Sequence, residues 1–286
     1  MTEAINNKII LPKRTIPELI ARYRLEPELS DVYVEGIFDK KIIDYWCKKN
    51  NNKKIKVYTI DSVDVPSDIL ISYELTSGNK QRVIALAKKL SISNGMVKFI
   101  VDKDLDEWLN LIQDAEGLIF TDFNSLEMYF LSEEIVDYII NDITECKITN
   151  WHSFYKSFLD VLKSLYAIRL ASNNLNFNFK WISVFKKDVL LKRGCLSLDE
   201  ASYIKKNLVS NGFNSHYEKF MTSYNEWLGK LNCDPRVCIH GHDFVDLIRN
   251  VIKLYKGIDE FNDQVVLSKL FFMYINNIDT LVQRIK

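Results

Sequence analysis

Between residues 31 and 145 the sequence alternates short β-branched runs with longer amphipathic segments, and this alternation limits the fold more than any other feature. The runs typical of strands are 31–36, 54–61, 96–102 and 117–122, and the segments typical of helices include 38–49, 79–91 and 125–143. Strands that alternate with helices form right-handed crossovers and a mainly parallel sheet. We therefore predict an α/β fold with a sheet of about four strands flanked by helices.

The remainder of the chain has mostly helical periodicity. The expected helices cover 151–172, 197–210, 215–231, 243–256 and 263–284, and one strand-like run lies at 236–239. The sequence thus predicts two parts. Residues 1–145 form the sheet-containing domain with a short N-terminal lead, and residues 146–286 form a helical region with one strand.

The charges are divided between these two parts. The 286 residues carry no net charge, but 31–145 have a net charge of −8 and 146–286 a net charge of +7. Clustered carboxylates attract cations and a basic surface attracts phosphates, although both regions can equally be ordinary solvated faces. A hydrophobic content of 47% excludes a disordered chain.

The same composition predicts a cytoplasmic location. The first residues, MTEAINNKII, are too polar for a secretory signal, and no run approaches the roughly 18 consecutive apolar residues of a membrane helix. Five cysteines in a chain of this length indicate a reduced protein without a disulfide framework. We expect no contact with a membrane.

Acidic residues follow the expected strands. Glu35 follows the first, Asp102, Asp104 and Asp106 follow the third, and Glu127 lies shortly after the fourth. Ligands bind outside the carboxyl ends of parallel strands, where these side chains would repel one another unless a cation neutralised them. Mg²⁺ prefers such oxygen ligands. In an extended segment Asp102 and Asp104 point the same way and can share one ion.

Each of these residues also has a structural interpretation. An aspartate after a strand is commonly a helix cap or turn former, which is an alternative for Asp106 and for Asp61 after the second strand. Glu35 fits that interpretation poorly. It lies between an apolar strand and Gly36, where burial of an unpaired carboxylate is costly.

These motifs resemble a known family. The segments VYVEGIFDKKIIDYW, FIVDKDLD and FTDFNSLEMYFL are similar to a Toprim domain, the Mg²⁺-dependent fold of topoisomerases, primases and overcoming-lysogenization-defect (OLD) nucleases. Together with SGNKQRVIALAKKL (77–90), AIRLASNNLNFNFKW (167–181) and HGHDFVDLIR (240–249), they resemble a Toprim-like nuclease family of bacterial anti-phage defence. That family includes the AriB-type effectors of the PARIS system. The resemblance covers about residues 31 to 250.

The resemblance implies roles for individual residues. Glu35 would act as general acid or base or bind a metal, with Asp39 in support. Asp102 and Asp104 would bind Mg²⁺, and Glu127 would complete a second metal position. Lys80 matches a basic position suited to a phosphate. Asp106 lengthens the acidic motif to three aspartates, so the resemblance does not decide which two of them bind metal.

The basic half offers candidates for contacts to nucleic acid. They are Lys180, Lys186, Lys187, Lys192, Arg193, Arg169, His240 and His242. Arg169 can face either a phosphate or an acidic partner such as Glu127. The two histidines can lie in a structural turn or at the rim of the acidic site. The spacing of Cys233 and Cys238 from these histidines is not a standard zinc pattern, and we do not expect zinc. Trp181 and Phe185 are spaced like a helix stripe, which favours packing over stacking on bases.

Two functions are consistent with these residues. The first is a Mg²⁺-dependent nuclease, in which Mn²⁺ can substitute, acting on nucleic acid such as tRNA or other structured RNA. The family resemblance implies a toxic effector in abortive infection, a homodimer when active, and regulation by an ABC-type or SMC-like ATPase partner. The chain itself has no Walker A motif. The second is a non-catalytic Toprim-shaped subunit that binds such an ATPase.

Overall fold

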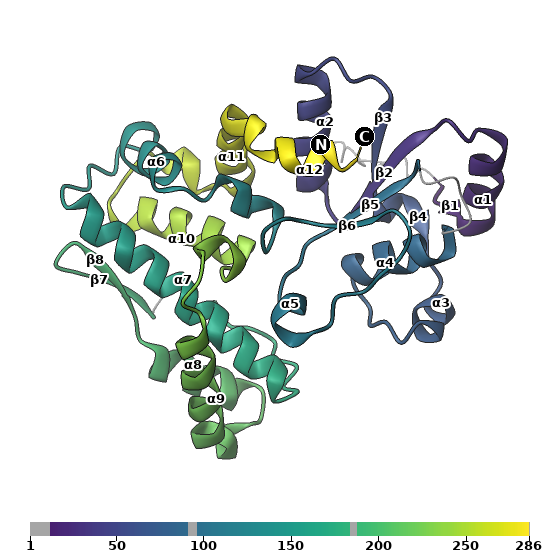
Figure 1. Ribbon diagram of the computed structural model, residues 1–286. Coiled ribbons are helices and arrows are strands. Elements are labelled where there is room, and N and C mark those ends of the chain that lie inside the picture. Colours follow the sequence, from purple (N-terminus) through teal and green to yellow (C-terminus); the bar gives the residue numbers. More distant parts are fainter. Residues whose placement is uncertain (1–11, 91–95, 184–187, 286) are drawn as a thin grey trace, which may run out of the picture. The chain divides into compact units, whose positions relative to one another are not determined.

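The computed structural model describes residues 12–90, 96–183 and 188–285. The chain forms two compact units (Figure 1). The first comprises Met1–Val101, Gln113–Phe120 and Val282–Lys286, and the second comprises Asp102–Ile112 and Thr121–Leu281. The expected α/β class is confirmed, with a parallel sheet flanked by helices and a helical C-terminal region.

The first unit contains the predicted four-stranded parallel sheet. Its strands, in spatial order, are β3 (Ile55–Thr59), β2 (Ser30–Val34), β5 (Lys98–Val101) and β6 (Leu118–Phe120). From β2 the chain runs through α2 (Ile37–Lys49) to β3 on one side, and later through α4 (Asn79–Leu90) to β5 on the other side. The direction of winding therefore reverses between β2 and β5. In open α/β sheets this reversal opens a crevice at the carboxyl ends of the strands.

Alternating side chains of the central strands supply two apolar faces. Tyr33 of β2 and Phe99 of β5 stack with ring centroids 5.8 Å apart and belong to a core shared with α4 and α1 (Ile16–Leu25). Their neighbours Val34 and Ile100 are also buried. Since successive side chains of a strand point to opposite faces, these two belong to the other face of the sheet. The remaining elements of this unit are β1 (Arg14–Thr15), η1 (Ile60–Ser62), β4 (Val63–Asp64) and α3 (Ser67–Ser72).

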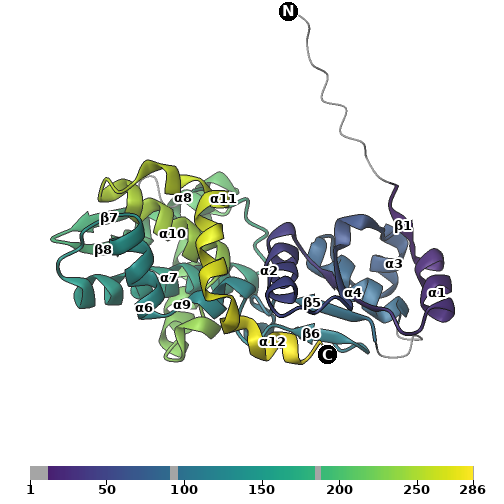
Figure 2. The same ribbon diagram turned by 90° about the horizontal axis from the view of Figure 1, so that it is seen from above.

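The longest helix of the second unit is α7 (Trp151–Asn174) (Figure 2). Apolar side chains recur along one stripe, including Phe154, Phe158 and Leu162, and all three are fully buried. Against α7 pack α9 (Tyr217–Lys230) and α10 (Gly241–Leu254). The other elements are α5 (Asp106–Leu109), η2 (Leu126–Phe130), α6 (Glu133–Asp137), η3 (Tyr138–Ile143), α8 (Glu200–Ser210), η4 (Asn214–His216), η6 (Asp259–Asn262), α11 (Gln264–Ser268) and η7 (Lys269–Ile278). The last helix, α12 (Asp279–Gln283), begins in this unit and ends in the first.

Three sequence expectations for helices and strands are wrong. The predicted strand at 236–239 is a 3₁₀ turn, η5 (Pro235–Val237). Pro235 fixes φ and lacks an N–H, and the Asp234 carboxylate caps the turn by accepting a bond from the Arg236 N–H at 2.9 Å. The expected single helix at 125–143 is divided into η2, α6 and the π-helical η3, because Ser132 starts a new helix by capping Ile135 N–H at 3.2 Å. The expected helix at 197–210 starts only at Glu200.

A β-hairpin precedes that helix instead. Strands β7 (Val189–Lys192) and β8 (Cys195–Leu198) pair antiparallel across a two-residue turn. Arg193 and Gly194 in this turn have φ of 52° and 79°, the backbone that matches the twist of a tight hairpin. The short apolar runs on both sides of Arg193-Gly194, separated by these two residues, are the sequence signal of this hairpin.

The segment Gln264–Gln283 is, by length and composition, apolar enough to cross a membrane. A third (33%) of its most apolar window is buried within the protein, and core helices have the same composition. Within this segment Phe271 stacks on Phe130 and Phe244, with ring centroids 5.0 and 6.0 Å apart. The helical geometry is interrupted at Tyr274.

Candidate functional site

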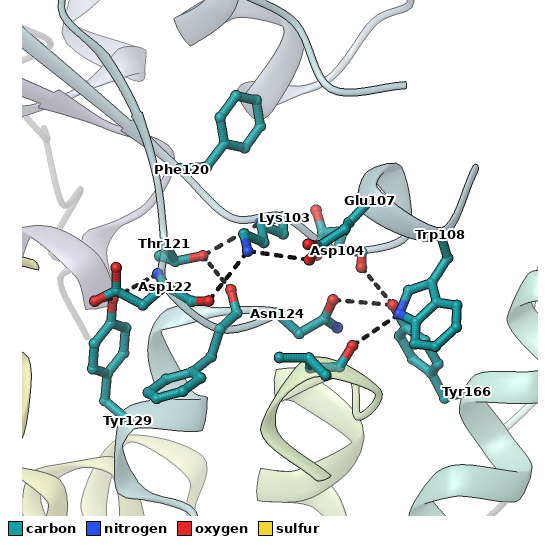
Figure 3. A network of polar contacts seen from close by, with 12 residues as sticks. Lys103, Asp104, Glu107, Trp108, Phe120, Thr121, Asp122, Asn124, Tyr129 and Tyr166 are labelled. Atoms are coloured by element: carbon teal, nitrogen blue, oxygen red, sulfur yellow. Dashed lines mark hydrogen bonds and ion pairs between the residues drawn. The ribbon is translucent and has the colours of Figure 1, made fainter. Parts of the chain in front are cut away.

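The acidic segment that follows β5 is fixed at Asp104. This residue has a left-handed backbone with φ of 50°, a conformation that aspartate and asparagine tolerate better than most residues. Its N–H donates to the Asn124 carbonyl at 2.8 Å, and its carbonyl accepts from the Tyr166 hydroxyl at 2.5 Å (Figure 3). An uncommon backbone conformation held from both sides is typical of functional sites.

Asn124 connects this segment to the turn before α10. Its N–H donates to the Arg236 carbonyl at 2.9 Å, and its side-chain amide donates to the Ile239 carbonyl at 2.8 Å. Its side-chain oxygen lies 3.0 Å from the Tyr166 hydroxyl, which is shared with Asp104. Burial, followed by the nearby charge of Asp104, raises the pKa of Tyr166, so the hydroxyl keeps its proton and remains a donor.

Further contacts bring the predicted metal ligands Asp102 and Glu127 into the same region. The Asp102 carboxylate accepts from the Leu126 N–H at 3.0 Å, and Leu126 directly precedes Glu127. The intervening Lys103 donates through its N–H to Thr121 Oγ1 at 3.3 Å and through its ammonium to the Asp122 carbonyl at 3.2 Å. The Asp-x-Asp segment and the loop before Glu127 therefore form one connected structure.

Glu127 is buried, with an exposed fraction of 9%, against the start of α10. A Cβ placed on Gly241, the first residue of α10, would lie only 2.3 Å from Glu127 Oε2 and 2.3 Å from Ser125 Oγ. A side chain at position 241 would therefore force the Glu127 or Ser125 side chain to move. The N-terminus of a helix carries partial positive charge, which favours a carboxylate at this place.

Asp106 lies in the first turn of α5, and its N–H donates to the Lys103 carbonyl at 3.0 Å. This placement agrees with the structural alternative of a helix-start residue. The described residues contain no group of three His, Cys, Asp or Glu side chains arranged to hold a metal ion. Carboxylate oxygens are nevertheless the donors that Mg²⁺ prefers, so the chemistry of the predicted set fits that ion.

Arg169 contacts Asp243 rather than the alternative acidic partner Glu127. Its Nε and Nη2 donate to the two Asp243 oxygens at 2.7 and 2.6 Å, a bidentate pair between α7 and α10. Burial disfavours the charged form of both groups. The mutual attraction outweighs it, so the pKa of Asp243 lies below and the pKa of Arg169 above its ordinary value.

His240 lies directly before α10, beside this pair. Burial, and then the charge of Arg169, lowers its pKa to about 4, so the imidazole is neutral at physiological pH. Its Nδ1 has no hydrogen-bond partner among the described residues and is 3.9 Å from Asp243 Oδ2. His242 is exposed, with its ring 5.4 Å from that of His240.

A pocket of about 390 Å³ opens next to these residues within the second unit. Its lining includes Asp104, Arg169 and His240 from the polar cluster, and Phe179 and Trp181 from the segment that follows α7. Trp181 lies outside the helices and strands, so the interpretation of 181 and 185 as a helix stripe is wrong for this residue. Phe185 lies outside the described residues.

Three predicted catalytic residues belong to the first unit. The Asp39 carboxylate accepts from the Gly36 N–H at 2.9 Å, which caps α2 immediately after Glu35. The Asn79 side chain donates to the Glu35 carbonyl at 3.0 Å, so the start of α4 reaches Glu35, and Lys80 is buried in the next position. It stays a prediction that Glu35 converges with the acidic residues of the second unit.

The other predicted basic positions, between residues 180 and 193, have no contact with this site among the residues that the structure describes. Lys180, Lys192 and Arg193 are exposed, the last in the turn of the β7–β8 hairpin. Lys186 and Lys187 lie outside the described residues. Exposed lysines and arginines of this kind can contact phosphates but also occur on ordinary solvated surfaces.

Sequence reasoning missed Tyr166, Asn124 and Asp243. Tyr166 precedes Arg169 by three residues on a helix, so both lie on the same face of α7, and that spacing is the signal that could have identified it. For Asp243 the sequence indicated only the start of the helix expected over 243–256. Comparison of the sequence with protein-family models gave no match, and comparison with curated proteins gave none.

Proposed function

We propose that this chain is a Mg²⁺-dependent nuclease of the Toprim-like kind, which hydrolyses phosphodiester bonds of nucleic acid. One observation carries the proposal. Strands β2 and β5 are parallel neighbours, with Val34 opposite Ile100, at the reversal of the sheet. The residues that follow their carboxyl ends are Glu35 and Asp102. A carboxylate residue therefore follows each of the two strands at the reversal, and open α/β sheets bind their ligands at such a reversal.

Hydrolysis of a phosphodiester requires an activated water and a stabilised leaving oxygen. In this proposal Asp102, Asp104 and Glu127 hold the metal, and Glu35 takes or donates the proton. When bound, a divalent ion supplies a Lewis acid that stabilises charge on the phosphoryl oxygens. The chain contributes a backbone at Asp104 that is hydrogen-bonded on both sides and a buried carboxylate at Glu127 beside Gly241.

The biological role in this proposal rests on the sequence resemblance. In this role the protein is a toxic effector of anti-phage defence that acts in the cytoplasm, is restrained by an ATPase partner and is active as a homodimer. Its proposed substrates include structured RNA such as tRNA.

The test is incubation of purified protein with plasmid, single-stranded DNA and total tRNA, with Mg²⁺, Mn²⁺ or a chelator. We expect metal-dependent cleavage of at least one substrate and loss of cleavage in Glu35→Gln and Asp104→Asn. Asparagine tolerates the left-handed backbone of position 104, so the second variant removes the charge and spares the fold. Calorimetric titration with Mn²⁺ should show weaker binding by Asp104→Asn, whose carboxylate holds the metal in this proposal.

The matched control is Asp160→Asn, an exposed position of α7 that should retain full cleavage. Cleavage by both site variants at the wild-type rate would refute the assignment. If wild-type protein cuts none of the substrates with either metal, also after release from its partner, the non-catalytic subunit is the better description.

A further inference from the structure

The pocket of the second unit has a wall of aromatic rings. Phe177, Phe179 and Trp181 come from the segment after α7 and all line the pocket, and the centroids of successive rings are 5.8 and 5.1 Å apart. Phe177 stacks on Phe213 with centroids 4.2 Å apart, and Phe179 stacks on Phe220 at 5.7 Å. The wall is therefore supported from behind by packed rings.

Hydrogen bonds hold the same segment in place. The Lys180 N–H donates to the Asn211 side chain at 2.8 Å, and the Ile182 N–H donates to the Asn207 side chain at 3.2 Å. The Ser172 hydroxyl donates to the Phe177 carbonyl at 2.7 Å. Binding a ligand against this wall costs little conformational entropy, because the wall is already ordered.

The charges of the pocket disfavour a phosphate as its occupant. The positive charge of Arg169 is matched by its bidentate pair with Asp243 and is 5.1 Å from the Trp181 ring. Asp104 adds a negative charge to the lining, and His240 is neutral at physiological pH.

The remaining polar groups suit a neutral ligand. The side chains of Asn173 and Asn178 are exposed at the lining, and each amide both donates and accepts hydrogen bonds. A volume of about 390 Å³ lies within the range of small-molecule sites, roughly 300–1,000 Å³. The occupant that fits is planar, aromatic, uncharged and rich in hydrogen-bonding edges.

We propose that this pocket binds one unpaired nucleobase of a single-stranded or looped nucleic acid, stacked against the Phe177–Trp181 wall. Unpaired bases are recognised in this way, by aromatic or guanidinium planes together with polar contacts to their edges. The proposal rests on the proposed nuclease function. Asp104 belongs to both the pocket and the predicted metal ligands, so a bound base would position the strand beside the cleavage site.

The first test measures binding without catalysis. Fluorescence anisotropy with a short fluorescein-labelled single-stranded oligonucleotide, in the presence of chelator, compares wild type with Trp181→Ala and Trp181→Phe. We expect Trp181→Ala to weaken binding by roughly 5- to 100-fold, the range for loss of one base–aromatic stack, and Trp181→Phe to restore most of it. The matched control is Trp227→Ala in α9. The Trp227 ring packs edge-to-face on Trp108, with centroids 6.5 Å apart, and neither tryptophan lines the pocket. This variant should bind the oligonucleotide as tightly as wild type.

The second test separates a base from a phosphate. Saturation-transfer NMR should show transfer to the base protons of adenosine 5′-monophosphate with wild type and Trp227→Ala, and its loss with Trp181→Ala. Ribose 5-phosphate should give no transfer. Equal transfer to ribose 5-phosphate, or unchanged oligonucleotide binding by Trp181→Ala, would overturn the pocket assignment.

Failure of the two proposals gives different results. Metal-dependent cleavage with no effect of Trp181→Ala on binding retains the nuclease and rejects the base pocket. Base binding lost in Trp181→Ala, without cleavage of any substrate by wild type, retains the pocket and rejects the nuclease.

Discussion

The hydroxyl of Tyr166, in the middle of α7, donates a 2.5 Å hydrogen bond to the main-chain carbonyl of Asp104. A helix of the second unit thereby fixes the backbone of a predicted metal ligand. The same hydroxyl lies 3.0 Å from Asn124, whose carbonyl accepts the Asp104 N–H. The position of the Asp104 carboxylate thus depends on residues that are far from it in sequence.

Tyr166→Phe should therefore lower the affinity for Mn²⁺ by more than it lowers the free energy of unfolding. We expect a loss of about 1 kcal/mol in the free energy of unfolding, the typical contribution of one hydrogen bond, measured by urea denaturation. The losses in Mn²⁺ affinity and in cleavage rate should each exceed the effect of 1 kcal/mol, which is about fivefold. The control is Tyr255→Phe. The Tyr255 hydroxyl donates to the Gly194 carbonyl at 3.1 Å and makes no bond to Asp104. Equal Mn²⁺ affinity in wild type and Tyr166→Phe would contradict this role.

Gly241→Ala should displace Glu127. A methyl group at position 241 would lie 2.3 Å from Glu127 Oε2 and from Ser125 Oγ, so one or both side chains must move. We expect destabilisation of about 1–3 kcal/mol from overpacking, together with weaker Mn²⁺ binding. The comparison is Gly229→Ala in α9, where nothing lies within 4 Å of the new Cβ. That variant should be neutral or slightly stabilised, since alanine favours a helix.

Removing one partner of the Arg169–Asp243 pair should be costly. In Asp243→Asn the largely buried guanidinium keeps its charge without a counter-charge, and we expect about 3–5 kcal/mol of destabilisation. The double variant Arg169→Met/Asp243→Leu should recover much of this loss, because both charges are then absent. Additive losses in the double variant would show that the two side chains do not interact as described.

The pair also predicts an acid-dependent loss of stability. Because the pKa of Asp243 is held below its ordinary value of 3.8, its contribution is complete above that value and decreases as the pH falls through the lower folded value. Urea denaturation of wild type and Arg169→Met/Asp243→Leu across this acid range should give a steeper decrease for wild type. Parallel pH profiles would argue against the contribution of the pair.

His240 predicts a second pH effect at higher pH. Its pKa is lowered from 6.5 to about 4, so the unfolded chain binds a proton more readily than the folded one. Stability is then complete above pH 6.5 and decreases as the pH falls toward 4. In His240→Gln, which does not titrate, this part of the decrease should vanish. An NMR titration that gives His240 an ordinary pKa would contradict the burial argument.

The parallel sheet could be predicted because each of its strands is a local pattern. β-branched runs such as 31–36 and 96–102 are followed by helical periodicity, and the parallel crossover follows from that order. The failures at 236–239 and 125–143 have local causes of a different kind. Pro235 and Ser132 act through capping and turn geometry, which outweigh the apolar pattern of the residues beside them.

The site was only partly predictable for a physical reason. Acids at strand ends are visible in the sequence, so Asp102, Asp104 and Glu127 could be proposed. The groups that hold them come from distant helices, and no local pattern links Tyr166 to Asp104 or Asp243 to Arg169. The charge of Arg169 illustrates the point, because the sequence left its partner open between a phosphate and an acid, and tertiary packing provides Asp243.

The last segment of the first unit is Val282–Lys286, where the Arg284 guanidinium donates to the Phe120 carbonyl of β6 at 2.8 Å. During synthesis the ribosome makes these residues after the whole of the second unit. The edge of the sheet therefore obtains its last contact late, although most of the sheet is translated early. Proteolysis just before Val282 would remove that contact and leave every predicted metal ligand in the uncut part of the chain.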